Sequence, residues 1–224
     1  MTIPTAHDPA AARGPLAAGR RFTTTGRLFA AGIAAAVLLA GALLALAGEP
    51  APGDAPRVSP VRVTSGSEIA TGFAIGRDRV VTVAHAVDGA VKARGMRARV
   101  LRVDRRSDLA LLAVRGSGGS SPAVGAVHAG AEVRVLRLRG GRSRSLTAHV
   151  RRAFVAHVRA PGAERALTRP ALELAAGVEA GDSGAPVLSS SGALAGVIFA
   201  TSNRRTDTAY AVDASALTRL LARD

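Results

Sequence analysis

A serine between two glycines is the residue of this sequence that is best suited to catalysis. Ser183 stands in the segment 179–188, with Asp182 directly before it and Gly184 directly after it. In that setting a hydroxyl can stand clear of the backbone, while nearby N–H groups face the negative charge that develops on an attacked carbonyl oxygen. Alone, the segment could equally be a glycine-rich turn between strands, so the interpretation depends on other parts of the chain.

A serine hydroxyl is a weak nucleophile, and it needs an adjacent base to accept its proton. Histidine suits this role because its pKa lies near neutrality. His85 ends the strand-like apolar run 80–84, where a strand would stop and a helical turn begin. The other histidines lie in the leader, in a loop-like stretch or among arginines, and we expect ordinary surface or core roles for them: His7, His128, His149 and His157.

Two aspartates compete to be the acid that fixes the histidine tautomer and stabilises the imidazolium. Asp108 directly precedes 109–114, a continuously apolar strand that can bury and orient a carboxylate. Asp104 stands in a charged turn, where we expect an exposed partner of arginine. We therefore predict a base, an acid and a nucleophile in the chain order His85, Asp108 and Ser183, with no cofactor and no metal.

Short strands separated by glycine and polar turns must position these three residues. Several runs alternate polar and apolar residues with period two, as half-buried strands do. We expect strands at 61–64, 69–75, 79–84, 98–103, 109–114, 132–138, 145–154, 171–174, 185–188, 193–200 and 208–212. So many short strands favour a sandwich or barrel. The segment 116–122, rich in glycine and serine, divides them into two groups, and residues 214–223 have the apolar spacing of a short terminal helix.

Over residues 60–220 this constellation resembles the trypsin/chymotrypsin-fold serine peptidases. The resemblance implies an all-β fold of two barrels, at about 61–115 and 123–212, followed by the helix at 214–223. The segment 71–76 and the strand that ends at His85 resemble the HtrA/Deg-like branch. The segments 192–200 and 207–212 are similar to membrane-anchored periplasmic proteases of the MarP type.

The resemblance also implies roles for the residues around the serine. Gly181 and Ser183 would donate their backbone N–H groups to the oxyanion, and Asp182 would help to shape that loop. The sequence departs from the commoner motif at Ala185, where a second glycine usually stands. No recognisable Ile-Val-Gly-Gly activation site precedes the domain, so activation by insertion of a new N-terminus is not expected.

The specificity pocket is expected to be uncharged. Trypsin-like enzymes that prefer basic side chains carry an acid six residues before the nucleophile, and here that position is Gly177. The strand expected to line the pocket offers Phe199, Ala200 and Thr201. The pocket would therefore favour small or medium apolar side chains.

Three functions fit these motifs. The favoured one is a serine endopeptidase that hydrolyses protein or peptide substrates through an acyl-enzyme. The second is a catalytically silent protease-fold module that binds a polymer or partner of the cell envelope, although such a module has no need of a complete set of His85, Asp108 and Ser183. The third is an esterase or other acyl hydrolase that uses the same three residues.

The N-terminal part of the chain has the pattern of a membrane anchor. Residues 1–27 form a basic leader with a single acid, and we expect it to stay in the cytoplasm. From Leu28 to Ala47 no residue is charged, and twenty such residues can cross a hydrocarbon core of about 30 Å. Residues 48–60 have the composition of an extended linker. The domain at 61–224 would then lie outside the cytoplasm, as part of a single-pass protein of the cell membrane.

A cleaved signal peptide is the alternative for this segment. Residues 45–47 resemble a signal cleavage site, and cleavage near Ala47 would release a secreted protein. Either interpretation exports the C-terminal part of the chain.

The net charge of +14 invites a nucleic-acid hypothesis, which we do not favour. Aromatic residues make up only 3% of the chain, so a stacking platform for bases is missing. The arginines are dispersed through alternating runs, and we expect them on solvated sheet faces, with contact to anionic lipid or cell-wall polymer as the alternative. The chain contains no cysteine, so its stability must come from packing rather than from disulfides.

Fractionation of cells that express the full chain, followed by N-terminal sequencing, tests the anchor. We expect a membrane-bound product that keeps its leader, because the arginines hold the N-terminus in the cytoplasm. A soluble exported product that begins at Gly48 would show that the segment is a cleaved signal.

Overall fold

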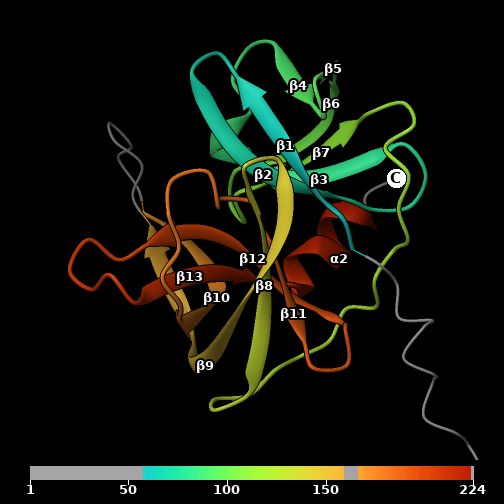
Figure 1. The fold of residues 1–224 in the computed structure, drawn as a ribbon. Helices are drawn as coiled ribbons and strands as arrows, with labels where there is room; N and C mark the ends of the chain where they lie inside the picture. The colour runs from blue at the N-terminus through green and yellow to red at the C-terminus, as the bar shows by residue number, and fades with distance from the viewer. Residues whose placement is uncertain (1–57, 159–165, 223–224) are drawn as a thin grey trace, which may run out of the picture. The chain divides into compact units, whose positions relative to one another are not determined.

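The computed structural model describes residues 58–158 and 166–222, which form two groups of strands and a short helix (Figure 1). The predicted leader, the predicted membrane segment and most of the predicted linker lie outside the described residues. Within the described part of the chain, no helix has the length and apolar character needed to cross a membrane.

The first group is a seven-stranded sheet with the order β5-β4-β1-β2-β3-β7-β6. All its pairs are antiparallel. Its strands are β1 (Pro60–Ser65), β2 (Glu68–Ala74), β3 (Arg79–Val83), β4 (Val91–Ala93), β5 (Met96–Arg97), β6 (Arg99–Asp104) and β7 (Leu109–Ala113).

This sheet is not a closed barrel of the kind predicted for 61–115, but it curls back on itself. Its two outer strands, β5 and β6, are successive segments of the chain separated by Ala98 alone. The Ala98 N–H donates to the carbonyl of Val91 in β4 at 2.9 Å. The extended segment 96–104 therefore pairs with β4 at one end and with β7 at the other.

The second group is a closed barrel in which the strands follow the order β10-β13-β12-β11-β8-β9. Its strands are β8 (Glu132–Arg139), β9 (Arg142–Val158), β10 (Leu167–Ala175), β11 (Pro186–Ser189), β12 (Leu194–Thr201) and β13 (Thr208–Asp213). The helix α2 (Ser215–Leu221) follows β13, and it contacts β7 of the first sheet. The barrel and the terminal helix confirm the predicted all-β class for the described residues.

Each of the eleven predicted strand segments overlaps an observed strand. The strands β4 and β5 were missed, because runs of three and two residues are too short to show a period. Strand β9 is longer than predicted: its first part pairs with β8 and its second part with β10. Arg142 and Arg144 leave no apolar run at the beginning of this strand.

Two apolar clusters fill the structure. One joins the inner side of the first sheet to α2 and to part of the second barrel, with Phe73, Leu112 and Leu217 almost fully buried. The other lies inside the closed barrel, around Val133 and Leu174. Four of the five residues of β7 are buried, so the residue that precedes this strand is held at the edge of a rigid core.

Candidate functional site

Residues from the first sheet bring His85 and Asp108 together. Strand β3 ends at Val83, a 3-10 turn follows at Ala84–Ala86, and Val83 pairs with Leu109 of β7. This register places Asp108 beside the turn, where its carbonyl accepts the Ala84 N–H at 3.0 Å. The Asp108 carboxylate accepts the backbone N–H of His85 at 3.0 Å through Oδ1, and Oδ2 lies 2.8 Å from His85 Nδ1.

The backbone of Asp108 has an uncommon conformation, with φ +59°. Non-glycine residues seldom occupy this left-handed region, which aspartate and asparagine tolerate best. The preceding turn is held by Asp104, which accepts the N–H groups of Arg106 and Ser107, and the Ser107 hydroxyl at 2.6 Å. The sequence predicts that Asp104 is an exposed partner of arginine. Its side chain also organises the turn that leads to Asp108, which the sequence did not reveal.

The surroundings of His85 raise its pKa above the ordinary value of 6.5. The hydrogen bond to Asp108 is the largest cause, and burial opposes it. The negative charges of Asp108 and Glu68 raise the pKa further, while the positive charge of Arg169 lowers it. With Asp108 at Nδ1, the neutral ring carries its proton on Nδ1 and leaves Nε2 as the acceptor.

The loop that carries Ser183 lies against strand β2 of the first sheet. The Thr71 N–H donates to the Ser183 carbonyl at 2.8 Å, and the Gly184 N–H donates to the Ile198 carbonyl at 2.7 Å. Gly184 has φ +87°, and a Cβ at this position would lie 1.8 Å from the Thr71 carbonyl oxygen. Only glycine allows so close an approach, so the glycine after the serine is a requirement of the contact between the two sheets.

Thr71 also fixes the residue at the start of the loop. Its hydroxyl donates to the Gly181 carbonyl at 2.7 Å, and its own carbonyl accepts the hydroxyl of buried Thr82 at 2.9 Å. Two carbonyls of the loop, those of Gly181 and Ser183, are thus tied to β2. Within residues 58–158 and 166–222, no hydrogen bond engages the N–H groups of these two residues.

Asp182 anchors the same loop from the side of the second barrel. Its carboxylate is fully buried and forms a two-pronged ion pair with Arg139 at the end of β8, with both contacts at 2.7 Å. It also accepts the Glu179 N–H at 3.0 Å. A buried carboxylate needs such partners, because an unpaired charge away from water is costly. Sequence reasoning missed Arg139, which was expected on a solvated sheet face.

The predicted nucleophile and base are not joined by a hydrogen bond in the described part of the chain: none is present between the Ser183 hydroxyl and the imidazole of His85.

The residues predicted for the pocket are spread along β12 and the loop before the serine. Phe199 is 9% exposed and packs into the core, and the Gly177 carbonyl accepts a hydrogen bond from Arg137 at 3.3 Å. The pocket stays a prediction.

A cavity of about 430 Å³ borders the serine loop at Gly181 and Ala180. Its walls come from β1, β2 and the turn between them, and from the end of β8. They include the apolar side chains of Ile69 and Leu138 and the charged side chains of Arg62, Glu68 and Arg139.

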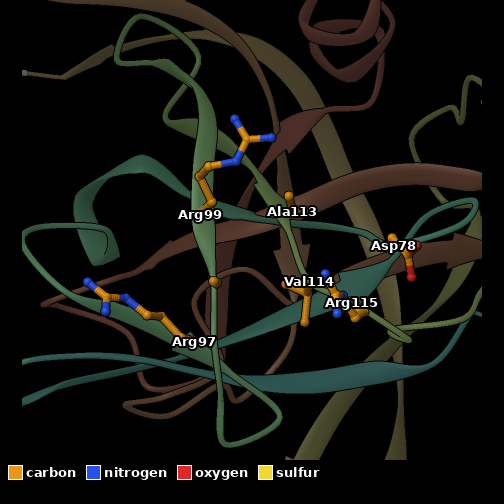
Figure 2. Close-up of a pocket in the computed structure, with 7 residues that line it drawn as sticks. Asp78, Arg97, Arg99, Ala113, Val114 and Arg115 are labelled. Carbon is orange, nitrogen blue, oxygen red and sulfur yellow. The ribbon is translucent and has the colours of Figure 1, made fainter.

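Another cavity, of about 660 Å³, lies away from the site (Figure 2). It is lined by Ala113 and Arg115 at the far end of β7 and by Asp78 just before β3. Figure 2 shows Arg97 and Arg99 with their side chains directed apart rather than toward a common centre. Within the described part of the chain, no three His, Asp or Glu side chains gather as metal ligands.

Residues 70–197 match the family described as the trypsin-like peptidase domain. The match covers more than half of the chain and includes His85, Asp108 and Ser183. The chain therefore belongs to this family.

Similar solved structures come from bacterial proteases. The active form of the Rv3671c (MarP) protease from M. tuberculosis is 30% identical, with a TM-score of 0.67 over 75% of this chain and 81% of that one. Its inactive form gives 30% and 0.65 over 74% and 88%. The HtrA-type protease AlgW, solved with a tripeptide, is 16% identical, with a TM-score of 0.58 over 75% and 59%, which shows a shared fold alone. The predicted family resemblance is confirmed. No curated protein sequence matches the chain.

Replacing Arg139 with methionine should destabilise the fold by about 3 kcal/mol, because it leaves the Asp182 carboxylate buried without its main partner. Urea unfolding of the purified variant measures the loss. Arg142→Met is the matched control: this exposed arginine begins the next strand, and its replacement should change the free energy of unfolding by less than about 0.5 kcal/mol. Equal stability of the two variants would contradict the assigned role of the ion pair.

Proposed function

We propose that this protein is a serine endopeptidase in which Ser183 is the nucleophile, His85 the base and Asp108 the acid that orients it. The observation that carries the proposal is the pair of hydrogen bonds between the Asp108 carboxylate and His85, one to the backbone N–H and one to Nδ1. These bonds turn Nε2 away from the carboxylate and leave it free to accept a proton. The Ser183 loop is tied to β2, which is the neighbour of β3, the strand that leads to His85.

The reaction would follow the two steps of acyl transfer. Nε2 of His85 takes the proton of the Ser183 hydroxyl as the oxygen attacks the peptide carbonyl. The protonated imidazole then gives this proton to the leaving amine, so that the C–N bond breaks and an acyl-enzyme remains. A water molecule, activated by the same nitrogen, hydrolyses the ester and restores the serine. Hydrogen bonds tighten in the complex with substrate, so contact between Ser183 and His85 is required only there.

The oxyanion formed in each step would bind to the backbone N–H groups of Gly181 and Ser183. Thr71 holds the carbonyls of both residues, which restrains the peptides that follow them and so limits movement of the loop, and neither N–H has another partner among the described residues. Donors that are already oriented stabilise the transition state without a cost of reorganisation. The ion pair of Asp182 with Arg139 supports the loop from its other side.

The substrate would be a protein or peptide that lies across the serine loop. On the leaving-group side we assign the 430 Å³ cavity beside Gly181, which offers both apolar and charged walls. On the acyl side we retain the uncharged pocket of Gly177, Phe199, Ala200 and Thr201. The acid of that region, Glu173, supports this choice because it is buried and neutralised by Arg152 at 2.8 Å and Arg205 at 2.6 Å.

The proposal includes export and anchoring. The sequence from Leu28 to Ala47 and the arginines before it support a single-pass protein of the cell membrane with the peptidase domain outside the cytoplasm.

Ser183→Ala should abolish peptide hydrolysis while the fold stays intact, because no other group can form the acyl-enzyme. Cleavage of a peptide library by the purified full chain and by the variant measures this, with circular dichroism as the check of folding. Ser202→Ala, in the turn after β12, should keep normal activity. Undiminished cleavage by Ser183→Ala would refute the assignment of the nucleophile.

The pH dependence of kcat/KM should report the raised pKa of His85. Only the neutral imidazole can accept the serine proton, so activity is lost as the pH falls through the pKa of His85. The hydrogen bond to Asp108 raises this pKa, and the midpoint of the acid limb should therefore lie above 6.5. A midpoint below 6.5 would argue against a histidine held in this way.

Asp108→Asn and Asp104→Asn separate the two candidate acids. Asparagine tolerates the left-handed backbone of Asp108, but it presents a donor where the imidazole needs an acceptor. Turnover should fall by about four orders of magnitude, the usual scale when the aspartate of a Ser-His-Asp triad is replaced with asparagine. Asp104→Asn keeps an oxygen for the turn and should change turnover little. The reverse result, measured at equal concentrations of folded protein, would exchange the two roles.

A further inference from the structure

A buried arginine from the second barrel reaches the carboxylate that holds His85. Arg169 lies in β10, and only 4% of its surface is exposed. Its guanidinium nitrogen Nη1 is 3.3 Å from Asp108 Oδ2, the same oxygen that lies 2.8 Å from His85 Nδ1. This oxygen therefore stands between an imidazole from the first sheet and a guanidinium from the second barrel.

One face of the guanidinium lies over an aromatic ring. Its central carbon lies 5.1 Å from the centre of the Phe199 ring, over the face of the ring. Among the described residues, Nε and Nη1 of Arg169 have no hydrogen-bond partner, although both are buried. An arginine stays charged even when buried, and a buried charge needs an opposite charge close by. Asp108 supplies that charge.

We propose that Arg169 is a positioning residue for His85: stacked on Phe199, it fixes the Asp108 carboxylate and divides the charge of that carboxylate between itself and the imidazole. The inference rests on the proposed function, and it adds a residue to the machinery of the same site. Arg169 touches neither Ser183 nor the substrate in this account, and it acts through Asp108 alone.

The sign of the electrostatic effect follows from the charges that face His85. Asp108 and Glu68 favour the protonated imidazole, whereas Arg169 disfavours it. Removing the charge of Arg169 raises the pKa of His85 further, so more of the base is protonated near neutral pH. The Asp108 carboxylate also loses its second anchor, so the imidazole is held less firmly.

Other charged groups lie on the outer side of Arg169. A cavity of about 580 Å³ is lined by Arg169 together with Asp104, Arg106 and Arg219. Arg219, in α2, is exposed and bonds to the Ser215 hydroxyl at 3.4 Å. It provides a matched control, because its replacement removes a positive charge from the same cavity without removing a contact to Asp108.

The test compares the wild-type full chain with Arg169→Met, Arg169→Lys and Arg219→Met. The first reading is the pH profile of kcat/KM on a peptide substrate. The second is the titration of the His85 imidazole, followed by NMR on ¹³C-histidine-labelled protein and assigned by the signal lost in His85→Gln.

We expect Arg169→Met to lower kcat by about tenfold to a hundredfold, the scale of a small misplacement of a catalytic group. Its acid limb and its His85 titration should both move to higher pH. Arg169→Lys should return both midpoints toward the wild type, because it restores the charge, while kcat stays reduced because an ammonium lacks the planar fork and stacks less well. Arg219→Met should match the wild type in kcat, in the pH profile and in the His85 titration.

The proposal is overturned if Arg169→Met leaves both midpoints in place, or if Arg169→Lys shifts them as far as methionine does. Should Arg169→Met not fold, Arg169→Gln replaces it and is judged by the same shifts. Failure of the proposed function would look different: the wild type would not cleave peptides, yet the NMR titration would still show whether Arg169 controls the charge of His85.

Discussion

The contact between strand β2 and the loop 181–184 is the constraint on which the whole site depends. His85 and Asp108 belong to one hydrogen-bonded sheet, while the Ser183 loop belongs to a separate closed barrel. Thr71 joins them by binding two carbonyls of the loop, and the approach is so close that Gly184 leaves no room for a side chain. The proposed chemistry therefore requires that the two sheets meet at this contact.

Two buried ion pairs support this junction, one across the two sheets (Asp108 with Arg169) and one within the second barrel (Asp182 with Arg139). Asp182 and Asp108 are buried carboxylates from different sheets, and each is approached by an arginine of the second barrel, Arg139 and Arg169 respectively. A chain without cysteine cannot lock such a junction with disulfides. Breaking one of these pairs would leave a buried charge uncompensated, which is costly. Some of the arginines thus pair with buried carboxylates. The prediction that they lie on solvated sheet faces does not hold for Arg139 and Arg169.

Much of the fold, and the members of the candidate site, could be predicted from local patterns. The apolar run of β7 and the strand end at His85 are visible in the sequence, so the order of His85, Asp108 and Ser183 and the strand segments around them could be inferred. Arg139 and Arg169 could not be found in this way, because their roles arise from strand pairing between distant segments, and their neighbours in the sequence look like those of any exposed arginine. The contacts of Thr71 depend on the same long-range packing.

Covalent labelling with a fluorophosphonate tests the central claim most directly, because this reagent reacts only with a serine that is activated by a base and an oxyanion site. Intact-mass measurement and peptide mapping of the full chain should show one adduct, located at Ser183, with the rate of labelling falling as His85 becomes protonated. A chain that is folded yet unlabelled, or that is labelled at another residue, would contradict the account.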